Sequence, residues 1–225
     1  MTELELRKLF VDTLRGYLGA REGDARHREL IDYYNSMTVL PRGYKMTYTA
    51  DWCVATAVAI GVKLGLEEII LPECSCSRQI IQYKSLDRFV EGPGFRPQIG
   101  DFIVYDWHDD NDPDHWGTVA EVEGDTLVII EGNMGDRVDT RVISTDDPRI
   151  HGYCLPDYAS KAAHEPESRL FADVRNDAWY ADAVAYCASL GLMVGTSGST
   201  FEPERAVTRG ELAAVVMRLH RLLTE

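Results

Sequence analysis

Residues 51–58 read Asp51-Trp52-Cys53-Val54-Ala55-Thr56-Ala57-Val58, and apolar residues continue at helical spacing to Leu64. The pattern predicts a largely buried helix over residues 53–64, with Asp51 as its N-cap. Cys53 would then lie in the first turn, where unpaired N–H groups and the helix dipole lower the pKa of a thiol. A cysteine in this position is either a nucleophile or a small core residue, which is the commoner role of a free cysteine.

A candidate base for this thiol lies further along the chain. Apolar residues alternate over residues 118–122 and again over 125–130, with Gly124 in the connection, which predicts a β-hairpin. His115 precedes the first strand, and Glu131 and Asn133 follow the second, so all three belong at the same end of the hairpin. A cysteine, a histidine base and a polar residue that orients the histidine form the site of many cysteine hydrolases.

Four motifs resemble, in their order along the chain, the CHAP domain of bacterial and phage cell-wall hydrolases. They are Trp52-Cys53, Pro97-Gln98-Ile99-Gly100-Asp101, His115-Trp116-Gly117 and Glu131-Gly132-Asn133. The resemblance covers residues 1–157 and implies a papain-like α+β domain, with N-terminal helices followed by an antiparallel sheet. It also implies that Cys53 is the nucleophile and His115 the base, that Glu131 orients His115, and that Asn133 assists or fixes the loop. Tyr48 is a candidate for polarising the scissile carbonyl oxygen, with an ordinary packed tyrosine as the alternative.

The remaining elements of this front domain follow from periodicity and capping. A helix is predicted over residues 3–18, where Thr2 and Glu5 have the spacing of a capping box, and a short helix over 29–34. Strands are predicted over 102–107, 137–143 and 150–154, and His27 is expected to be exposed in a polar turn. Helices followed by an antiparallel sheet are an α+β arrangement.

Metal sites are weakly indicated. Related CHAP domains bind calcium in an acidic loop before the cysteine, but Lys45, Thr47 and Thr49 stand there instead. The acidic run 109–114 lacks the closing Gly and Glu of a calcium loop and contains a proline, and His108 beside it does not begin a strand and is a weaker base than His115. Cys74-Ser75-Cys76 has no second pair to complete a zinc site, which favours two free thiols in a loop. We therefore predict no metal and no cofactor.

Composition limits the class of function. The net charge of −14 argues against nucleic-acid binding, and residues 1–157 hold 28 of the 37 acidic residues and 16 of the 23 basic ones. Five cysteines, an odd number, indicate no disulfide framework, and Cys154 and Cys187 lie in apolar contexts typical of a core.

The N-terminus is acidic and has no basic and long apolar region of a signal peptide, and no segment has the length of a membrane span. Either a signal was removed, or the protein is made in the cytosol and released as a phage lysin is, through a holin pore. We expect a location at the cell wall or outside the cell, with no membrane partner.

A polar linker over residues 158–169 precedes a tail that resembles one S-layer homology repeat, residues 170–225. The motifs are Phe171-Ala172-Asp173-Val174, Trp179-Tyr180, Gly191-Leu192-Met193 and Thr208-Arg209-Gly210-Glu211, where Gly210 replaces the family's usual alanine. The resemblance implies a small all-α module, here with a helix that ends before Gly191 and another over 208–222. It also implies that Trp179, Gly195 and Arg209 line a pocket for an anionic secondary cell-wall polysaccharide.

These features together predict a two-module peptidoglycan hydrolase. The bond is an amide, either the N-acetylmuramoyl-L-alanine junction or a bond of the stem or cross-bridge, and the sequence leaves this open. The alternative is a catalytically silent protein that binds the cell wall or the S-layer. One repeat cannot bury all of its own apolar residues, so the tail either docks on residues 1–157 or self-associates, which we favour.

Overall fold

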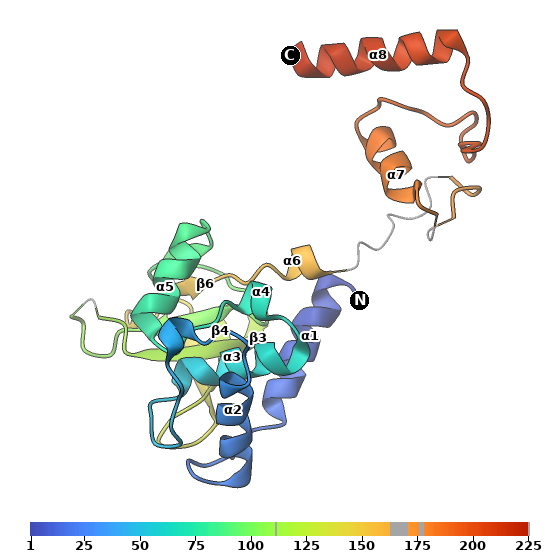
Figure 1. The fold of residues 1–225 in the computed structure, drawn as a ribbon. Helices are drawn as coiled ribbons and strands as arrows, with labels where there is room; N and C mark the ends of the chain where they lie inside the picture. The colour runs from blue at the N-terminus through green and yellow to red at the C-terminus, as the bar shows by residue number, and fades with distance from the viewer. Residues whose placement is uncertain (111, 163–170, 176–177, 225) are drawn as a thin grey trace. The chain divides into compact units, whose positions relative to one another are not determined.

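The computed structural model of the chain describes residues 1–225 except 111, 163–170, 176–177 and 225 (Figure 1). It divides into two compact units, Met1–Ala162 and Ala163–Glu225. None of the described helices combines the length and the apolar character that crossing a membrane requires.

The first unit combines helices with one antiparallel sheet (Figure 1). Its helices are α1 (Glu3–Arg15), α2 (Ala25–Asn35), the single turn η1 (Pro41–Gly43), α3 (Cys53–Leu64), α4 (Glu67–Ile70), α5 (Cys76–Ser85) and α6 (Tyr158–Lys161). Its strands are β1 (Phe89–Glu91), β2 (Phe102–Tyr105), β3 (His115–Glu123), β4 (Thr126–Glu131), β5 (Asp139–Ser144) and β6 (Ile150–Cys154), in the order β1-β6-β2-β3-β4-β5. The predicted α+β class is confirmed at this level.

Helix α3 is the centre of the first unit's core. Every residue from Cys53 to Gly61 is buried, and the helix packs against α1, α2 and β3. It ends at Gly65, whose φ of 67° suits a glycine C-cap. The predicted cap at Asp51 is wrong: Trp52 is the N-cap residue and makes no side-chain cap bond, while Asp51 accepts a bond from Asn133 across the loop.

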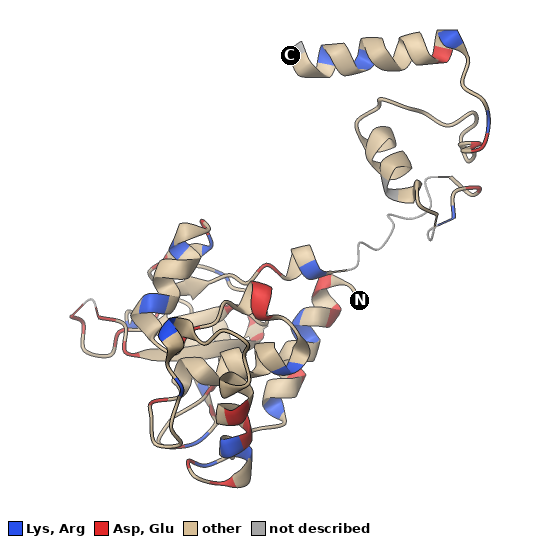
Figure 2. Cartoon of the chain, in the orientation of Figure 1, with Lys and Arg blue, Asp and Glu red and all other residues tan. Residues whose placement is uncertain are grey.

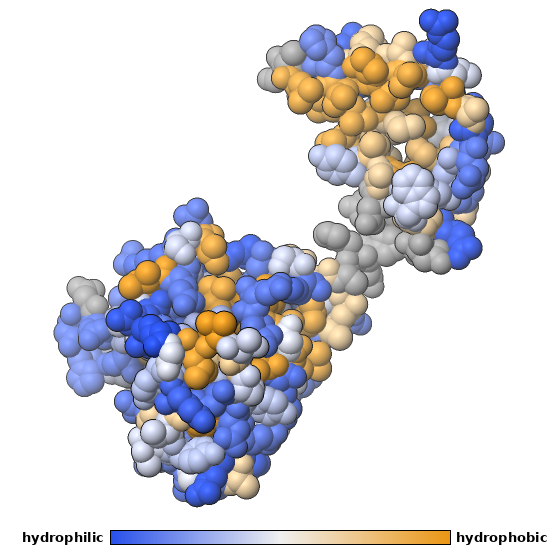
Figure 3. Space-filling model, viewed as in Figure 1, coloured by the Kyte–Doolittle hydropathy of each residue, from blue (hydrophilic) through white to orange (hydrophobic). Residues whose placement is uncertain are grey.

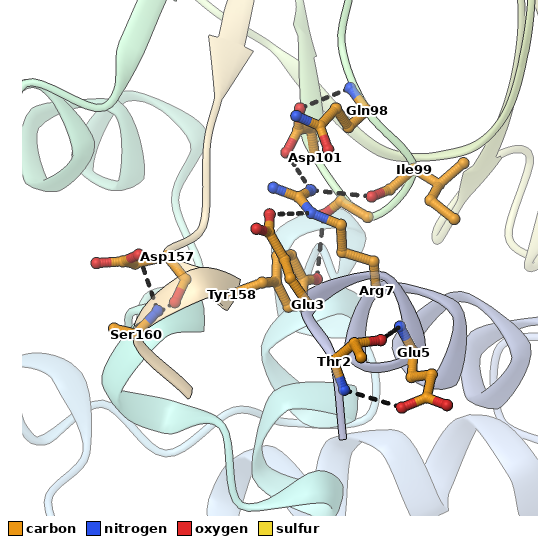
Figure 4. Close-up of polar contacts among 11 residues, drawn as sticks. Thr2, Glu3, Glu5, Arg7, Gln98, Ile99, Asp101, Asp157, Tyr158 and Ser160 are labelled. Atoms are coloured by element: carbon orange, nitrogen blue, oxygen red, sulfur yellow. Dashed lines mark hydrogen bonds and ion pairs between the residues drawn. The ribbon is translucent and has the colours of Figure 1, made fainter. Parts of the chain in front are cut away.

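Helix α1 is fastened to the sheet by a buried ion pair (Figure 4). Its predicted capping box between Thr2 and Glu5 is present, although the helix ends at Arg15 and not at residue 18. The Arg7 guanidinium donates to Asp101 Oδ1 at 2.8 Å and to the Ile99 carbonyl at 3.0 Å. The guanidinium also lies 4.6 Å from the ring centroid of Tyr158 in α6.

Tyr158 extends the first unit beyond residue 157. Its ring is fully buried against Phe10, and its hydroxyl donates to the Gly100 carbonyl. Residues 158–162 therefore belong to the first unit and are not linker. The rest of the predicted linker, 163–169, lies outside the described residues.

His27 corrects another expectation, because its side chain is fully buried in α2 and not exposed. Its ring lies 4.6 Å from that of Trp52, and its Nδ1 accepts from the Gly23 N–H at 2.9 Å. A residue that the sequence places in a polar turn thus lies in a helix and packs against the residue that precedes α3.

The tail unit contains α7 (Ala181–Ser189) and α8 (Arg209–Thr224). Thr208 and Glu211 form the predicted capping box, and Gly191 follows α7 with φ 64°. Asp173 accepts from the N–H groups of Phe201 and Glu202 at 2.8 and 2.7 Å, which fixes the segment before α8.

The middle of α8 presents an exposed apolar side. Figure 2 shows charged residues at the start of α8 and again in its second half, and Figure 3 shows hydrophobic side chains gathered along it. The large apolar residues that remain exposed are Leu212, Val216, Met217, Leu219, Leu222 and Leu223. Among the described tail residues, the buried apolar side chains are Phe171, Val184 and Leu192. Self-association through α8 stays a prediction.

Candidate active site

The end of the β3–β4 hairpin meets the start of α3, and this brings Cys53, His115 and Glu131 together. Cys53 is the first residue of α3, His115 the first of β3 and Glu131 the last of β4. Because β3 and β4 are antiparallel, the first residue of one strand and the last of the other share an end. His115 Nε2 lies 3.0 Å from Glu131 Oε2, and the ring also hydrogen-bonds Cys53. With Nε2 on the carboxylate, Nδ1 is the nitrogen left for the sulfur.

Electrostatics favour a thiolate and an imidazolium at this site. Hydrogen bonding with Cys76, followed by the hydrogen bond and charge of His115, lowers the pKa of Cys53 to about 5 although burial opposes the shift. Burial lowers the pKa of His115, but its bonds with Cys53 and Glu131 outweigh burial and raise that pKa to about 9. The pair is therefore ionised at neutral pH, which is the reactive form of a cysteine nucleophile.

Glu131 is held as a carboxylate by a residue that sequence reasoning missed. It is fully buried, and Arg141 in β5 donates to both of its oxygens, at 2.6 and 2.9 Å. Burial raises the pKa of Glu131, but the bonds from His115 and Arg141 outweigh it and leave the pKa below its ordinary value. Arg141 pairs with Ile129, so it faces the same side of the sheet as Glu131. The alternation of faces along β5 could have pointed to Arg141 in the sequence, but only if the pairing of β5 with β4 had been known.

An aromatic ladder supports the same cluster. The Arg141 guanidinium lies 4.6 Å from the ring centroid of Trp107, which stacks on Tyr105 at 4.6 Å. Tyr105 in turn stacks against the His115 ring at 6.0 Å with planes 20° apart. The imidazole is thus held by a carboxylate at one edge and by an aromatic face.

Two motif glycines permit the close packing of the site. A Cβ on Gly117 would lie 2.3 Å from Ile129 Cγ2 and 3.0 Å from Glu131 Cγ. A Cβ on Gly132 would lie 1.9 Å from Thr56 Oγ1 on α3. Glycine at position 132 lets the hairpin end approach the helix that carries Cys53, and glycine at position 117 leaves room for the side chains of Ile129 and Glu131.

Cys76 is a further residue that the sequence did not bring to the site. It is the first residue of α5 and is buried, so the predicted pair of loop thiols is wrong for Cys76. Its Sγ lies 3.9 Å from Cys53 Sγ. Hydrogen bonding with Cys53, burial and the Cys53 charge raise the pKa of Cys76, so Cys76 remains a thiol that can donate S–H to the Cys53 thiolate.

Asn133 and Tyr48 have partners other than His115. Asn133 adopts a φ of 58° and donates to Asp51 at 3.4 Å, a contact that fits fixing the loop. The Tyr48 hydroxyl donates to Asp32 in α2 at 2.7 Å. This bond directs the hydroxyl to α2 and does not support a role in polarising the scissile carbonyl. His108 is paired with Asp114 at 2.6 Å.

In the tail, the three predicted binding residues differ in exposure. Trp179 is 92 % exposed before α7, and Arg209 is exposed at the start of α8. Gly195 is packed instead: a Cβ there would lie 2.3 Å from the Thr200 carbonyl and 2.4 Å from the Phe171 ring. Its glycine identity follows from this close approach. Arg209 lies on the same open side of α8 as Leu212, Val216 and His220.

Replacing Arg141 with methionine is expected to lower kcat/KM by about 10- to 100-fold, since it removes two charge-assisted hydrogen bonds to Glu131. Methionine preserves an apolar stem against Trp107. The matched control is Arg149→Met, because Arg149 also lies over Trp107, at 5.1 Å, but pairs with Asp147. Equal losses of cysteine-dependent activity in the two variants would contradict the positioning role of Arg141.

Comparison with known proteins identifies the tail. Residues 170–213 match the S-layer homology domain. Over 47 residues the chain is 40% identical to "Surface-layer 125 kDa protein" of Lysinibacillus sphaericus, which covers 21% of this chain and 4% of that protein. Over 54 residues it is 35% identical to "Exoglucanase XynX" of Acetivibrio thermocellus, which covers 24% of this chain and 5% of that protein. The chain thus spans only a small part of the length of these relatives.

A solved structure titled "The crystal structure of Ly7917" aligns with 58% of this chain and 62% of its own, at 17% identity and a TM-score of 0.34, too low to carry an argument. The family match shows that an S-layer homology domain is present in the tail.

Proposed function

We propose that the first unit is a cysteine-dependent hydrolase that cleaves an amide bond in peptidoglycan, and that the tail holds it at the cell wall. The observation that carries the proposal is the chain of contacts from Cys53 to His115 and from His115 to the buried carboxylate of Glu131. The papain-like CHAP assignment of this unit rests on its motifs, since the family match covers the tail alone. The α+β architecture agrees with that assignment.

In the proposed reaction, the Cys53 thiolate attacks the amide carbonyl and forms a tetrahedral intermediate. The backbone N–H of Cys53, at the start of α3, has no partner within the helix and is available to the oxyanion. The His115 imidazolium then protonates the leaving amine as the C–N bond breaks, which leaves a thioester on Cys53. Neutral His115 next removes a proton from water, and the water oxygen attacks the thioester. This releases the acid and restores the Cys53 thiolate and the His115 imidazolium. Glu131 orients the ring in both steps.

The substrate class is supported by the tail. A domain that binds wall polysaccharide raises the local concentration of wall amides around a tethered site. The scissile bond is either the N-acetylmuramoyl-L-alanine junction or a peptide bond of the stem or cross-bridge. The expected location is the cell wall or the extracellular space.

The second candidate function is a non-catalytic protein attached to the wall or the S-layer. It is favoured by the family match, which supports wall attachment and covers residues 170–213 without reaching Cys53, His115 or Glu131. Against it stands the ionised thiol–imidazole pair, because a fold that only binds has no need of a thiolate held beside an imidazolium.

Digestion of purified peptidoglycan distinguishes these functions. New N-terminal L-alanine, identified by mass, indicates an amidase, whereas new glycine or diamino-acid termini indicate an endopeptidase. A digest with no new termini after prolonged incubation would leave only the non-catalytic role.

The pH profile of the proposed hydrolase should be bell-shaped. Activity should rise as Cys53, whose pKa is about 5, loses its proton, and fall as His115, whose pKa is about 9, loses its own. The measurement is kcat/KM on soluble muropeptide against pH. In Glu131→Gln the alkaline limb should move to lower pH, because the carboxylate that helps to raise the pKa of His115 is gone. An unmoved alkaline limb would contradict the assignment of that limb to His115.

Wall binding should depend on the tail. Residues 1–162, which retain Tyr158, should still cleave soluble muropeptide but pellet poorly with intact walls. In the full chain, Arg209→Ala should weaken wall binding by about tenfold or more if its guanidinium meets an anionic sugar. Arg221→Ala, near the other end of α8, serves as the control. Equal pelleting of the full chain and of residues 1–162 would remove the anchoring role.

A further inference from the structure

Cys53 and Cys76 are two buried thiols that face each other at the starts of separate helices. Cys53 begins α3, Cys76 begins α5, and their sulfurs are 3.9 Å apart. A disulfide requires about 2.05 Å between sulfurs, so the two must approach by about 2 Å. The cysteines are 23 positions apart in sequence, and the fold alone brings them together.

The proposed hydrolysis needs a nucleophile at Cys53 and a hydrogen-bond donor at position 76, but it does not need the donor to be a thiol. A serine at position 76 would supply a donor at the start of α5 without adding a second oxidisable sulfur beside the nucleophile. Both cysteines retain 9 % exposure, which gives a small oxidant a path to the sulfurs.

We propose that Cys53 and Cys76 are a redox-active pair, in which a hydroperoxide oxidises Cys53 and Cys76 then closes a disulfide that blocks the nucleophile reversibly. The chemistry of the pair stands by itself. Its consequence for activity rests on the proposed hydrolase function.

The oxidation proceeds in two balanced steps. The Cys53 thiolate attacks one oxygen of the hydroperoxide, the O–O bond breaks, and with a proton the products are a sulfenic acid and water or an alcohol. The Cys76 sulfur then attacks the sulfenic sulfur, the S–S bond forms as the S–O bond breaks, and the leaving hydroxide takes the Cys76 proton to form water. Two equivalents of an added thiol reverse the disulfide.

The first step prepares the second. While Cys53 is a thiolate, hydrogen bonding with it and its charge are among the causes that raise the pKa of Cys76. A neutral sulfenic acid at Cys53 removes that charge, so Cys76 becomes easier to ionise when it is needed as the attacking sulfur. In the reduced state Cys76 remains a thiol and leaves the Cys53–His115 ion pair intact.

The test uses hydrogen peroxide on the full chain, followed by iodoacetamide and trypsin without reduction. Cys74 shares a tryptic peptide with Cys76, residues 64–78, whereas Cys53 is alone in residues 46–63. The Cys74→Ser variant therefore leaves one cysteine in each peptide, and a linked mass identifies the Cys53–Cys76 bond without ambiguity. We expect this linked peptide in oxidised Cys74→Ser and its loss on treatment with dithiothreitol.

Activity gives the second readout. Wild type and Cys74→Ser should lose activity by about tenfold or more on oxidation and regain it with dithiothreitol. Cys76→Ser should lose activity on the same oxidation and should not regain it with dithiothreitol. Without Cys76 to close a disulfide, the sulfenic acid of Cys53 reacts with more peroxide and becomes the sulfinic acid. Absence of the linked peptide, or equal recovery in Cys76→Ser, would overturn the proposal. If the protein has no hydrolase activity, the peptide mass still decides whether the thiol pair closes.

Discussion

Replacing Cys53 with alanine is expected to abolish peptidoglycan cleavage, with a loss of about 10³- to 10⁶-fold in kcat/KM. The variant removes the sulfur that His115 and Cys76 hold as a thiolate, and the hydrogen-bond partner of the His115 ring at this end of α3 is Cys53 and not Cys76. Alanine suits the start of α3, and only one atom is lost from a site that is 9 % exposed. Folding and wall binding should therefore persist.

The measurement is clearing of a wall suspension together with release of new termini from soluble muropeptide. His115→Ala should be nearly as severe, since it removes both the charge partner of the thiolate and the proton donor for the leaving amine. Glu131→Gln should be milder, because an orienting group usually contributes less than the base or the nucleophile. Cys74→Ala, a half-buried cysteine near α5, is the matched control and should keep its activity. Full clearing by Cys53→Ala would show that another residue is the nucleophile.

The parts of the fold that the sequence predicts well are those with local periodicity. Helix α3 has the predicted bounds, as does β6, and the β3–β4 hairpin turns at Gly124 as expected. Once the hairpin is fixed, the proximity of His115 and Glu131 follows from antiparallel pairing alone, without knowledge of the rest of the sheet.

The parts that escaped prediction depend on which elements become neighbours. Arg141 reaches Glu131 only because β5 pairs with β4, and Cys76 reaches Cys53 only because α5 begins beside α3. His27 looked like a surface residue because its sequence neighbours are polar, yet it packs on Trp52. Each of these contacts joins residues that no local period relates.

The role of Asp101 also required the fold. In the sequence it is one letter of a motif, and the structure makes it the partner of Arg7 at the junction of α1, the sheet and α6 (Figure 4). The side chains of Arg7 and Asp101 are 8% and 4% exposed. The Gln98 N–H donates to the second Asp101 oxygen at 2.8 Å, so both oxygens of the carboxylate have a donor.

Arg7→Ala is accordingly expected to lower the free energy of unfolding of the first unit by about 3–5 kcal/mol, since it leaves the Asp101 carboxylate buried without its charge partner. It also removes the guanidinium from the Tyr158 ring. Arg15→Ala, on the same helix, is the matched control: Arg15 pairs with Asp12 and Glu121 but is 37% exposed, so its loss should cost about 1 kcal/mol or less.

Urea unfolding of the full chain, followed by tryptophan fluorescence, measures the stability of the first unit in the Arg7→Ala and Arg15→Ala variants. Trp52 and Trp116 are buried in the first unit, whereas Trp179 in the tail is already 92 % exposed and should change little. Replacing both partners with apolar residues, Arg7→Leu with Asp101→Leu, should recover part of the lost stability, because no unpaired carboxylate then remains buried. Similar midpoints for Arg7→Ala and Arg15→Ala would show that the buried pair does not fasten α1 to the sheet.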